Sequence, residues 1–234
     1  MSMIEVRNLI KTFGVTPVLR GLDFQVEQGE FVALLGPNGA GKTTFLRILA
    51  TLSKASMGSV HVAGFTLPKQ AQAVRRKLGV VSHQPLLYGD LTAEENLRFY
   101  ARMYAINNMD RRIDEILEFV GLRYRRRDLV RQFSRGMQQR LAIGRSILHH
   151  PSILLFDEPH TGLDQEAAEM LDGLLQRVAA EGRTVVMTSH DITRAAHLAT
   201  RVDILSKGRI SRSINSGEIE VGDLPSIYRE ATYA

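Results

Sequence analysis

The sequence contains no cysteine, which excludes disulfide bonds, thiolate metal sites and cysteine nucleophiles. No apolar run approaches the ~18 residues that a membrane-spanning helix needs, and the first residues do not form a secretory signal. The sequence also has no internal repeat and no low-complexity segment. We therefore expect an ordered protein that is made and kept in the cytosol.

The composition provides enough apolar material for a large core. The 234 residues are 44% hydrophobic, which fits one large domain or a core with an inserted lobe. The net charge of +5 would suit nucleic acid, anionic lipid or nucleotide phosphates. The densest basic cluster lies within residues 123–127, and we interpret it as a solvated face.

Short β-like runs dominate the first 35 residues. The segments "IEVRNL", "VLRGLDFQV" and "EFVALL" alternate with glycines at 14, 21 and 29, which we interpret as turns. The run "FVALL" is continuously apolar, as in a strand buried on both faces.

The middle of the chain, residues 92–150, is helical in character. Thr92 and Glu95 have the spacing of a capping box. Strand-like runs then return in "SILLF" and "TVVMTS", around a helix near residues 165–181, and a hairpin follows at Gly208. This pattern predicts an α/β fold in a single domain over residues 1–234. Its core covers about 1–85 and 151–234, and its helical lobe covers about 86–150.

Residues 36–43, "GPNGAGKT", fit the pattern G-x-x-x-x-G-K-[ST] of a phosphate-binding loop. Its glycines let successive backbone N–H groups point at a phosphate, and the helix that follows adds its positive end. Lys42 would reach the β- and γ-phosphates, and the Thr43 hydroxyl would ligate Mg²⁺. The predicted nucleotide-binding residues of this loop are Gly36, Pro37, Asn38, Gly39, Ala40, Gly41, Lys42, Thr43 and Thr44.

A second motif, "ILLFDEP", supplies the carboxylates that such a loop needs. Four apolar residues lead to Asp157 at the predicted end of a strand. Asp157 would hold Mg²⁺ through water, and Glu158 would polarise an attacking water as general base. The cofactors that we expect from these motifs are therefore a nucleoside triphosphate and Mg²⁺, and the cradle alone allows kinases, GTPases, helicases and transport ATPases.

The spacing of these motifs narrows the class of protein. No Asn-Lys-x-Asp motif for guanine occurs, which argues against a GTPase. The separation of 115 positions between Lys42 and Asp157 is long for a compact nucleotide kinase and leaves room for the helical lobe.

With the segment "FSRGMQQR" at residues 133–140, nearly the whole chain resembles the ATP-binding subunit of an ABC transporter. The resemblance implies a P-loop NTPase core with an N-terminal antiparallel β subdomain and the inserted helical lobe. It also implies two ATPase chains that pair head to tail around two ATP molecules. Ser134 and Gly136 would then cap the γ-phosphate held by the other chain, from the positive end of a helix.

Other positions take their roles from the same resemblance. Phe13 would stack on adenine, and Gln84 in "VSHQPLLY" would sense Mg²⁺ and the γ-phosphate. Asp164 ends the "TGLD" loop that would cross the dimer interface, and His190 in "TSHD" would contact the γ-phosphate. The predicted catalytic residues are Glu158, His190 and Gln84. The predicted metal-binding residues are Thr43, Gln84 and Asp157.

The signature segment departs from the commonest family form, Leu-Ser-Gly-Gly-Gln. Phe133, Arg135 and Met137 replace its first, third and fifth residues, while Ser134 and Gly136 remain. Two interpretations of Arg135 stay open at this point: a cation near the phosphate of the other chain, or a side chain that points into solvent.

The resemblance implies an ATPase on the cytoplasmic side of the cell membrane, peripheral to separate transmembrane permease subunits. The segment "QPLLYGDLTAEENL" offers apolar residues either for that contact or for the core of the lobe. We expect a homodimer or a paired ATPase chain, and no nucleic-acid partner. The alternative is a soluble ABC-type ATPase of iron–sulfur assembly. The chain lacks the long coiled coil of a DNA-end protein and the second cradle usual in a ribosome factor.

Within the family, the segments "ALLGPNGAGKTT" and "FSRGMQQRLAIGR" are most similar in sequence to the CcmA group of cytochrome c maturation ATPases. That likeness implies haem export with haem-handling membrane subunits.

Overall fold

A computed structural model describes residues 2–82, 84–218 and 222–233. None of the helices formed by these residues is long and apolar enough to cross a lipid bilayer.

The centre of the molecule is a six-stranded sheet, in which all neighbouring strands are parallel except the edge pair β9 and β10. In spatial order its strands are β10 (Arg209–Asn215), β9 (Arg201–Ser206), β3 (Phe31–Leu35), β8 (Thr184–Thr188), β7 (Ile153–Asp157) and β6 (Leu78–Val81). Every residue of β3, β7 and β8 is buried, which explains their continuous apolar runs. Because parallel strands end at the same edge, the loops after β3, β7 and β8 meet there.

Two apolar cores cover the two faces of this sheet. In β3, Phe31, Ala33 and Leu35 belong to one core, while Val32 and Leu34 belong to the other, as the two-residue period of a strand requires. Helix α1 (Lys42–Leu49) lies in the second core with the N-terminal strands, and α6 (Gln165–Ala180) lies in the first with the lobe helices. Outside the lobe, the described residues also form helices α2 (Ala71–Lys77), α7 (Ile192–Leu198) and α8 (Leu224–Tyr233).

The N-terminal strands form the predicted antiparallel sheet, in the order β2 (Thr16–Glu27), β1 (Ser2–Phe13), β4 (Met57–Val62) and β5 (Phe65–Leu67). The interpretation of Gly21 as a turn was wrong. Leu9 pairs with Leu22 and Ile10 with Arg20, so Gly21 is an extra residue inside β2, a β-bulge with φ of 83°.

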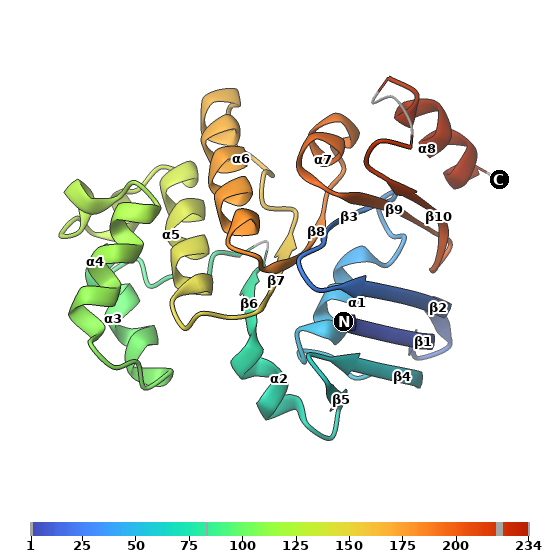
Figure 1. Cartoon of the computed structure of the whole chain (residues 1–234), viewed down its shortest axis with the longest axis horizontal. Coiled ribbons are helices and arrows are strands. Elements are labelled where there is room, and N and C mark those ends of the chain that lie inside the picture. The colour runs from blue at the N-terminus through green and yellow to red at the C-terminus, as the bar shows by residue number, and fades with distance from the viewer. Residues whose placement is uncertain (1, 83, 219–221, 234) are drawn as a thin grey trace.

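Three helices between β6 and β7 form the lobe at one end of the molecule, far from the antiparallel sheet (Figure 1). They are α3 (Ala93–Met103), α4 (Met109–Phe119) and α5 (Arg135–Ile147), with short 3₁₀ turns at Arg123–Arg125 and Val130–Gln132. The predicted capping box is confirmed: Glu95 N–H donates to Thr92 Oγ1 at 3.2 Å, and Thr92 N–H donates to Glu95 Oε2 at 2.8 Å. The lobe boundaries at 86 and 150 stay a prediction.

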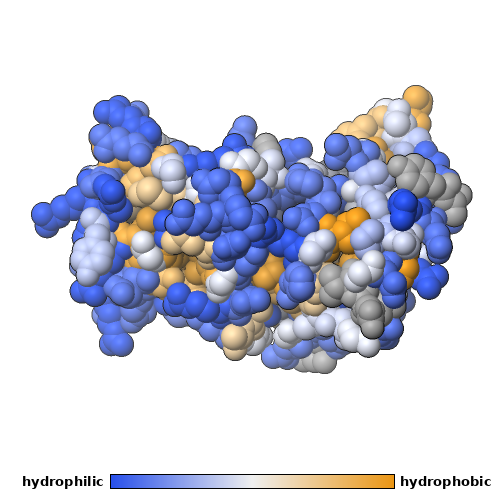
Figure 2. Space-filling model, turned by 90° about the horizontal axis from the view of Figure 1, so that it is seen from above, coloured by the Kyte–Doolittle hydropathy of each residue, from blue (hydrophilic) through white to orange (hydrophobic). Residues whose placement is uncertain are grey.

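The face of the molecule seen from above (Figure 2) carries both hydrophilic and apolar side chains. Figure 2 shows hydrophilic side chains over most of one face, with apolar areas that are separate from one another. The basic cluster of residues 123–127 is largely balanced by acidic neighbours. Its ion pairs join Arg123 to Glu118, Arg125 to Asp128, and Arg126 to Glu94 and Asp114. These pairs support the interpretation of a solvated face.

Candidate active site

The loop between β3 and α1 forms a cradle that only glycine permits at its two ends. A Cβ at Gly36 would lie 2.3 Å from the backbone oxygen of Leu205. Gly41 has φ of 108°, and a Cβ there would lie 2.8 Å from Leu19. A cavity of about 320 Å³ opens on this loop, lined by Val18, residues 37–44 and Glu158.

Lys42 places a cation inside this cradle. Its side chain is only 5% exposed, and its Nζ donates to the backbone oxygens of Gly36 at 2.7 Å and Pro37 at 3.3 Å. Burial lowers the pKa of Lys42, while the nearby Glu158 and Asp157 carboxylates oppose that shift. The ammonium group is therefore desolvated and held by carbonyl oxygens of its own loop, which a phosphate oxygen could replace.

Asp157 ends β7 beside the first residues of α1. Its Oδ1 accepts hydrogen bonds from Thr43 Oγ1 at 3.1 Å and from Thr188 Oγ1 at 2.8 Å. A threonine hydroxyl and a carboxylate side by side are hard oxygen ligands of the kind that Mg²⁺ prefers. These residues fit Mg²⁺, which when bound would neutralise charge on the β- and γ-phosphates.

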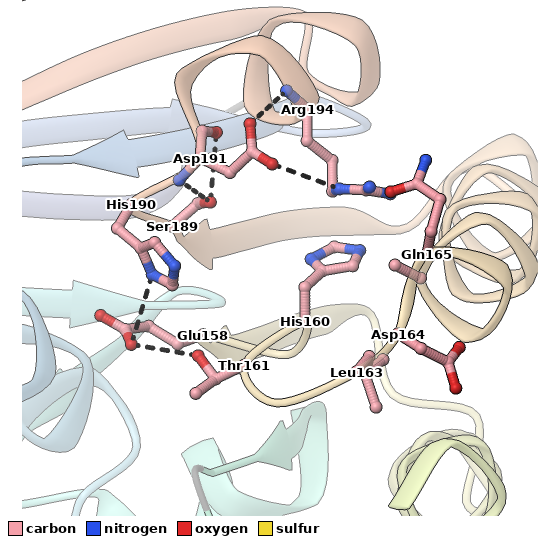
Figure 3. Close-up of a pocket in the computed structure, with 11 residues that line it drawn as sticks. Glu158, His160, Thr161, Leu163, Asp164, Gln165, Ser189, His190, Asp191 and Arg194 are labelled. Atoms are coloured by element: carbon pink, nitrogen blue, oxygen red, sulfur yellow. Dashed lines mark hydrogen bonds and ion pairs between the residues drawn. The ribbon is translucent and has the colours of Figure 1, made fainter.

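Glu158 follows directly, in a left-handed backbone conformation with φ of 50°. Its N–H donates to Thr188 Oγ1 at 3.0 Å, which holds the strained turn in place. Its carboxylate accepts from Thr161 Oγ1 at 3.3 Å and lies 3.7 Å from His190 Nδ1 and 3.8 Å from Lys42 Nζ. The carboxylate is therefore shared between the cradle and the residues shown in Figure 3.

Those residues surround a second cavity of about 200 Å³. His190 lies at its edge and is 62% exposed, so its ring can reach a group outside this chain. His160 is held by its Nε2, 2.8 Å from Asp172 Oδ1, and Asp172 also pairs with Arg194 of α7. Burial lowers the pKa of His160, although Asp172 opposes that shift.

Phe13 and Gln84 lie outside the set of described residues that line either cavity. Phe13 ends β1 with 56% of its surface exposed, and Lys11 Nζ lies 4.7 Å from the centre of its ring. Gln84 is exposed, and its backbone oxygen accepts from Ser82 Oγ at 2.6 Å. The predicted roles of both side chains therefore stay predictions.

Ser134 and Asp164 cap two helices that begin beside each other. Ser134 Oγ accepts from Met137 N–H at 3.3 Å at the start of α5, and Asp164 Oδ1 accepts from Ala167 N–H at 2.8 Å at the start of α6. A Cβ on Gly136 would lie 2.9 Å from the Cβ of Ala167, so this glycine allows the two helix starts to touch. Neither Ser134 nor Gly136 is among the described residues that line the cradle cavity.

Arg135 is exposed, and its side chain also contacts its own chain, which neither of the two interpretations drawn from the sequence included. Its Nε donates to the backbone oxygen of Thr161 at 2.8 Å, and its guanidinium packs against Gly162. In this structure the side chain contacts the "TGLD" loop of its own chain.

Comparison with known proteins decides the family. The family model described as "ABC transporter" matches residues 19–161. The chain belongs to this family of ATPases.

This ABC ATPase is similar to ATP-binding proteins that are named for different processes. The linearmycin resistance ATP-binding protein LnrL of Bacillus subtilis is 34% identical over 210 residues, covering 89% of this chain and 68% of that protein. The cell division ATP-binding protein FtsE of Streptococcus pneumoniae is 36% identical over 230 residues, covering 95% of this chain and all of that protein.

Solved structures agree with the fold. A dimeric ATP-binding cassette in a post-hydrolysis state, bound to ADP and Pi, superposes with a TM-score of 0.83 at 30% identity, covering 93% of this chain and 100% of that chain. An ATP-binding subunit of an ABC transporter superposes at 0.85 with 28% identity, covering 97% and 99%. The ABC ATPase is thus an enzyme that binds and hydrolyses ATP.

Sequence reasoning missed Thr188 and Thr161 in this ABC ATPase. Thr188 bridges Asp157 and the N–H of Glu158, and Thr161 holds the Glu158 carboxylate. Thr188 ends the strand "TVVMT", two residues before His190, and that position was the signal available. Since β8 lies between β3 and β7, its last residue must fall between the cradle and Asp157.

Proposed function

We propose that this ATPase hydrolyses ATP at a site completed by a second ATPase chain, arranged head to tail. The observation that carries the proposal is a separation within one chain. The cradle cavity is lined by residues 37–44 and Glu158, whereas Ser134 and Gly136 lie at the start of α5 and are not among its described lining residues. The positive end of a helix suits a phosphate that another chain presents.

Within that site each residue has a separate task. Lys42 binds the β- and γ-phosphates, while Thr43 and Asp157 hold Mg²⁺. Glu158 takes the proton of the attacking water, because its carboxylate faces the cradle and is oriented by Thr161. His190 contacts the γ-phosphate from its exposed position.

We propose that membrane subunits dock at the junction of the core and the lobe. A cavity of about 180 Å³ there is lined in part by Leu52, Leu86, Tyr104 and Arg145. Leu52, Leu86 and Tyr104 are exposed by 64%, 52% and 40%, so together they place apolar surface around this cavity. The segment that follows Gln84, predicted to offer apolar residues, supplies Leu86. The ATPase would thereby work at the cytoplasmic side of the cell membrane, peripheral to its partners.

The narrower function of haem export in cytochrome c maturation rests on the amino-acid sequence of two motifs. The relatives described above are named for linearmycin resistance and cell division and do not refer to haem. Coexpression with haem-handling membrane subunits tests the haem role, which predicts copurification and faster ATP hydrolysis. Copurification with soluble iron–sulfur assembly proteins instead would favour the alternative.

Size-exclusion chromatography with excess Mg-ATP tests the head-to-tail site. Glu158→Gln keeps the shape of the side chain but removes the basic carboxylate, so it should accumulate as an ATP-bound dimer. Adding Ser134→Arg should disperse that dimer while each chain still binds ATP. The exposed Ser216 provides a matched control, since Ser216→Arg in the same background should leave the dimer intact. A monomeric Glu158→Gln protein, or a dimer that survives Ser134→Arg, would contradict the proposal.

A further inference from the structure

Arg135 occupies a position where the commonest family form has glycine, and its side chain has a defined place. Its Nε donates to Thr161 O at 2.8 Å. Gly162, with φ of 75°, leaves room for the guanidinium, because a Cβ there would lie 2.9 Å from Arg135 Nε and 3.0 Å from its Cζ. A planar guanidinium can lie flat on a glycine and still donate from its edge.

The base of this side chain is also fixed. Ser134 caps the helix directly before it, and Gly136 directly after it touches Ala167 of α6. The start of α5 therefore cannot shift away from α6 without losing close packing. Arg135 extends from this fixed point to the loop between Glu158 and Asp164.

That loop leads back to the carboxylate at the centre of the site. Thr161 N–H donates to Glu158 O at 3.2 Å, and Thr161 Oγ1 donates to Glu158 Oε2 at 3.3 Å. On its other side the loop is held by His160, which pairs with Asp172 of α6. Arg135 and His160 thus hold the loop from two sides, and Thr161 connects the loop to Glu158.

We propose that Arg135 is a positioning residue, which holds the loop Glu158–Asp164 of its own chain and so fixes the orientation of the Glu158 carboxylate. It acts through Thr161 and does not bind phosphate. The catalytic part of this inference rests on the proposed role of Glu158 as general base. The structural part, the attachment of the loop, does not.

Steady-state kinetics of a double-mutant cycle tests the catalytic part. Arg135→Gln shortens the side chain out of reach of Thr161, and Thr161→Val removes only the hydroxyl that contacts Glu158. Each variant should lower kcat about tenfold with KM for ATP changed less than about twofold, because the cradle is untouched. The double variant should be no more than about twofold slower than either single variant, since both act on one contact chain.

Arg131 offers a matched control close to the signature. It forms an exposed ion pair with Asp90 at 2.8 Å, so Arg131→Gln removes the same charge without touching the loop. We expect its kcat to stay within about twofold of the wild type. A raised KM for Arg135→Gln that depends on salt would indicate a phosphate contact and overturn the proposal. Unchanged kcat, or additive losses in the double variant, would also overturn it.

Amide hydrogen exchange of the nucleotide-free protein tests the attachment independently of catalysis. The N–H groups of Thr161 and Leu163 donate to Glu158 O and His160 O within the loop. In Arg135→Gln these amides should exchange at least about fivefold faster, while Arg131→Gln should match the wild type. Equal exchange in all three proteins would overturn the attachment. If the loop loosens as expected but Glu158→Gln still turns over ATP, the role of Glu158 is wrong and the attachment stands.

Discussion

The cradle and the signature segment differ in how deeply their polar groups are buried. In the cradle, Lys42 is 5% exposed, Asp157 8% and Thr188 0%, and their hydrogen bonds close within one chain. In the signature segment, Ser134 is exposed at the start of a helix, where its Oγ accepts from the Met137 N–H at 3.3 Å. The strand ends bury the polar groups of the cradle, whereas the helix start at Ser134 leaves its cap exposed.

The largest effect in this comparison is expected at Lys42. Lys42→Ala removes the cation of the cradle and should lower ATP hydrolysis at least about 100-fold, because desolvated charges contribute most where negative charge develops. Turnover is measured with saturating Mg-ATP, and binding by calorimetry. Lys69 is exposed, and Lys69→Ala is the control for loss of a lysine. Hydrolysis by Lys42→Ala at the wild-type rate would show that residues 36–43 are not the site.

A second prediction compares the two ends of β8. Thr188→Val removes the hydroxyl that bridges Asp157 and Glu158 N–H, and should cost about 2–3 kcal/mol of unfolding free energy, since buried polar groups lose their partner. It should also lower kcat about tenfold, because Glu158 loses its fixed backbone.

Thr184 at the other end of β8 is the matched control. It is equally buried and accepts from Gly29 N–H at 3.0 Å, far from the cradle. Thr184→Val should lose comparable stability in urea denaturation and keep kcat within about twofold. Equal losses of kcat in both variants would mean that Thr188 acts only through general stability.

These two regions also show which structural features can be predicted from the sequence. The cradle could be predicted because its chemistry is contiguous along residues 36–43. The strands β3, β7 and β8 were predicted because strands buried on both faces are continuously apolar. The capping box at Thr92 is equally local, and its predicted hydrogen bonds are present.

What the sequence did not reveal depends on pairing across the chain. Gly21 looked like a turn, and only its register against β1 makes it a bulge. Thr188 acquires its role from the order of strands, which periodicity does not contain. Arg135 was undecided between phosphate and solvent because its partner, the backbone oxygen of Thr161, carries no side-chain signal.

A third prediction concerns the C-terminal end of α5, the helix that begins in the signature segment. Beyond the C-terminal end of α5, His149 stacks on Tyr104 and lies 3.0 Å from Leu78 O, and burial lowers its pKa to about 4. Because the unfolded chain binds this proton more readily, the neutral ring contributes stability above pH 6.5, and the contribution is lost as the pH falls toward 4. Between pH 7.5 and 4.5 the wild type should lose about 2 kcal/mol more than His149→Gln in urea denaturation, the side chain being only partly buried.

The exposed His197 on α7 serves as the control for this pH series. His197→Gln should follow the wild type at both pH values. If His149→Gln loses as much stability in acid as the wild type, protonation of His149 is not what destabilises the protein at low pH.

The smallest expected effect concerns Phe13, which should contribute to the binding of the adenine base but not of the phosphates. Phe13 is exposed and lies outside the cradle cavity, so stacking on adenine would add about 1 kcal/mol, a roughly fivefold change in Kd. Phe13→Ala should weaken ATP by that factor, Phe13→Tyr should not, and inorganic triphosphate should bind all three proteins equally because it has no ring. Competition binding with a fluorescent ATP analogue measures all of these. A loss that triphosphate shares would place the effect of Phe13 on the cradle itself, and the division between a preorganised phosphate site and an exposed base contact would then be wrong.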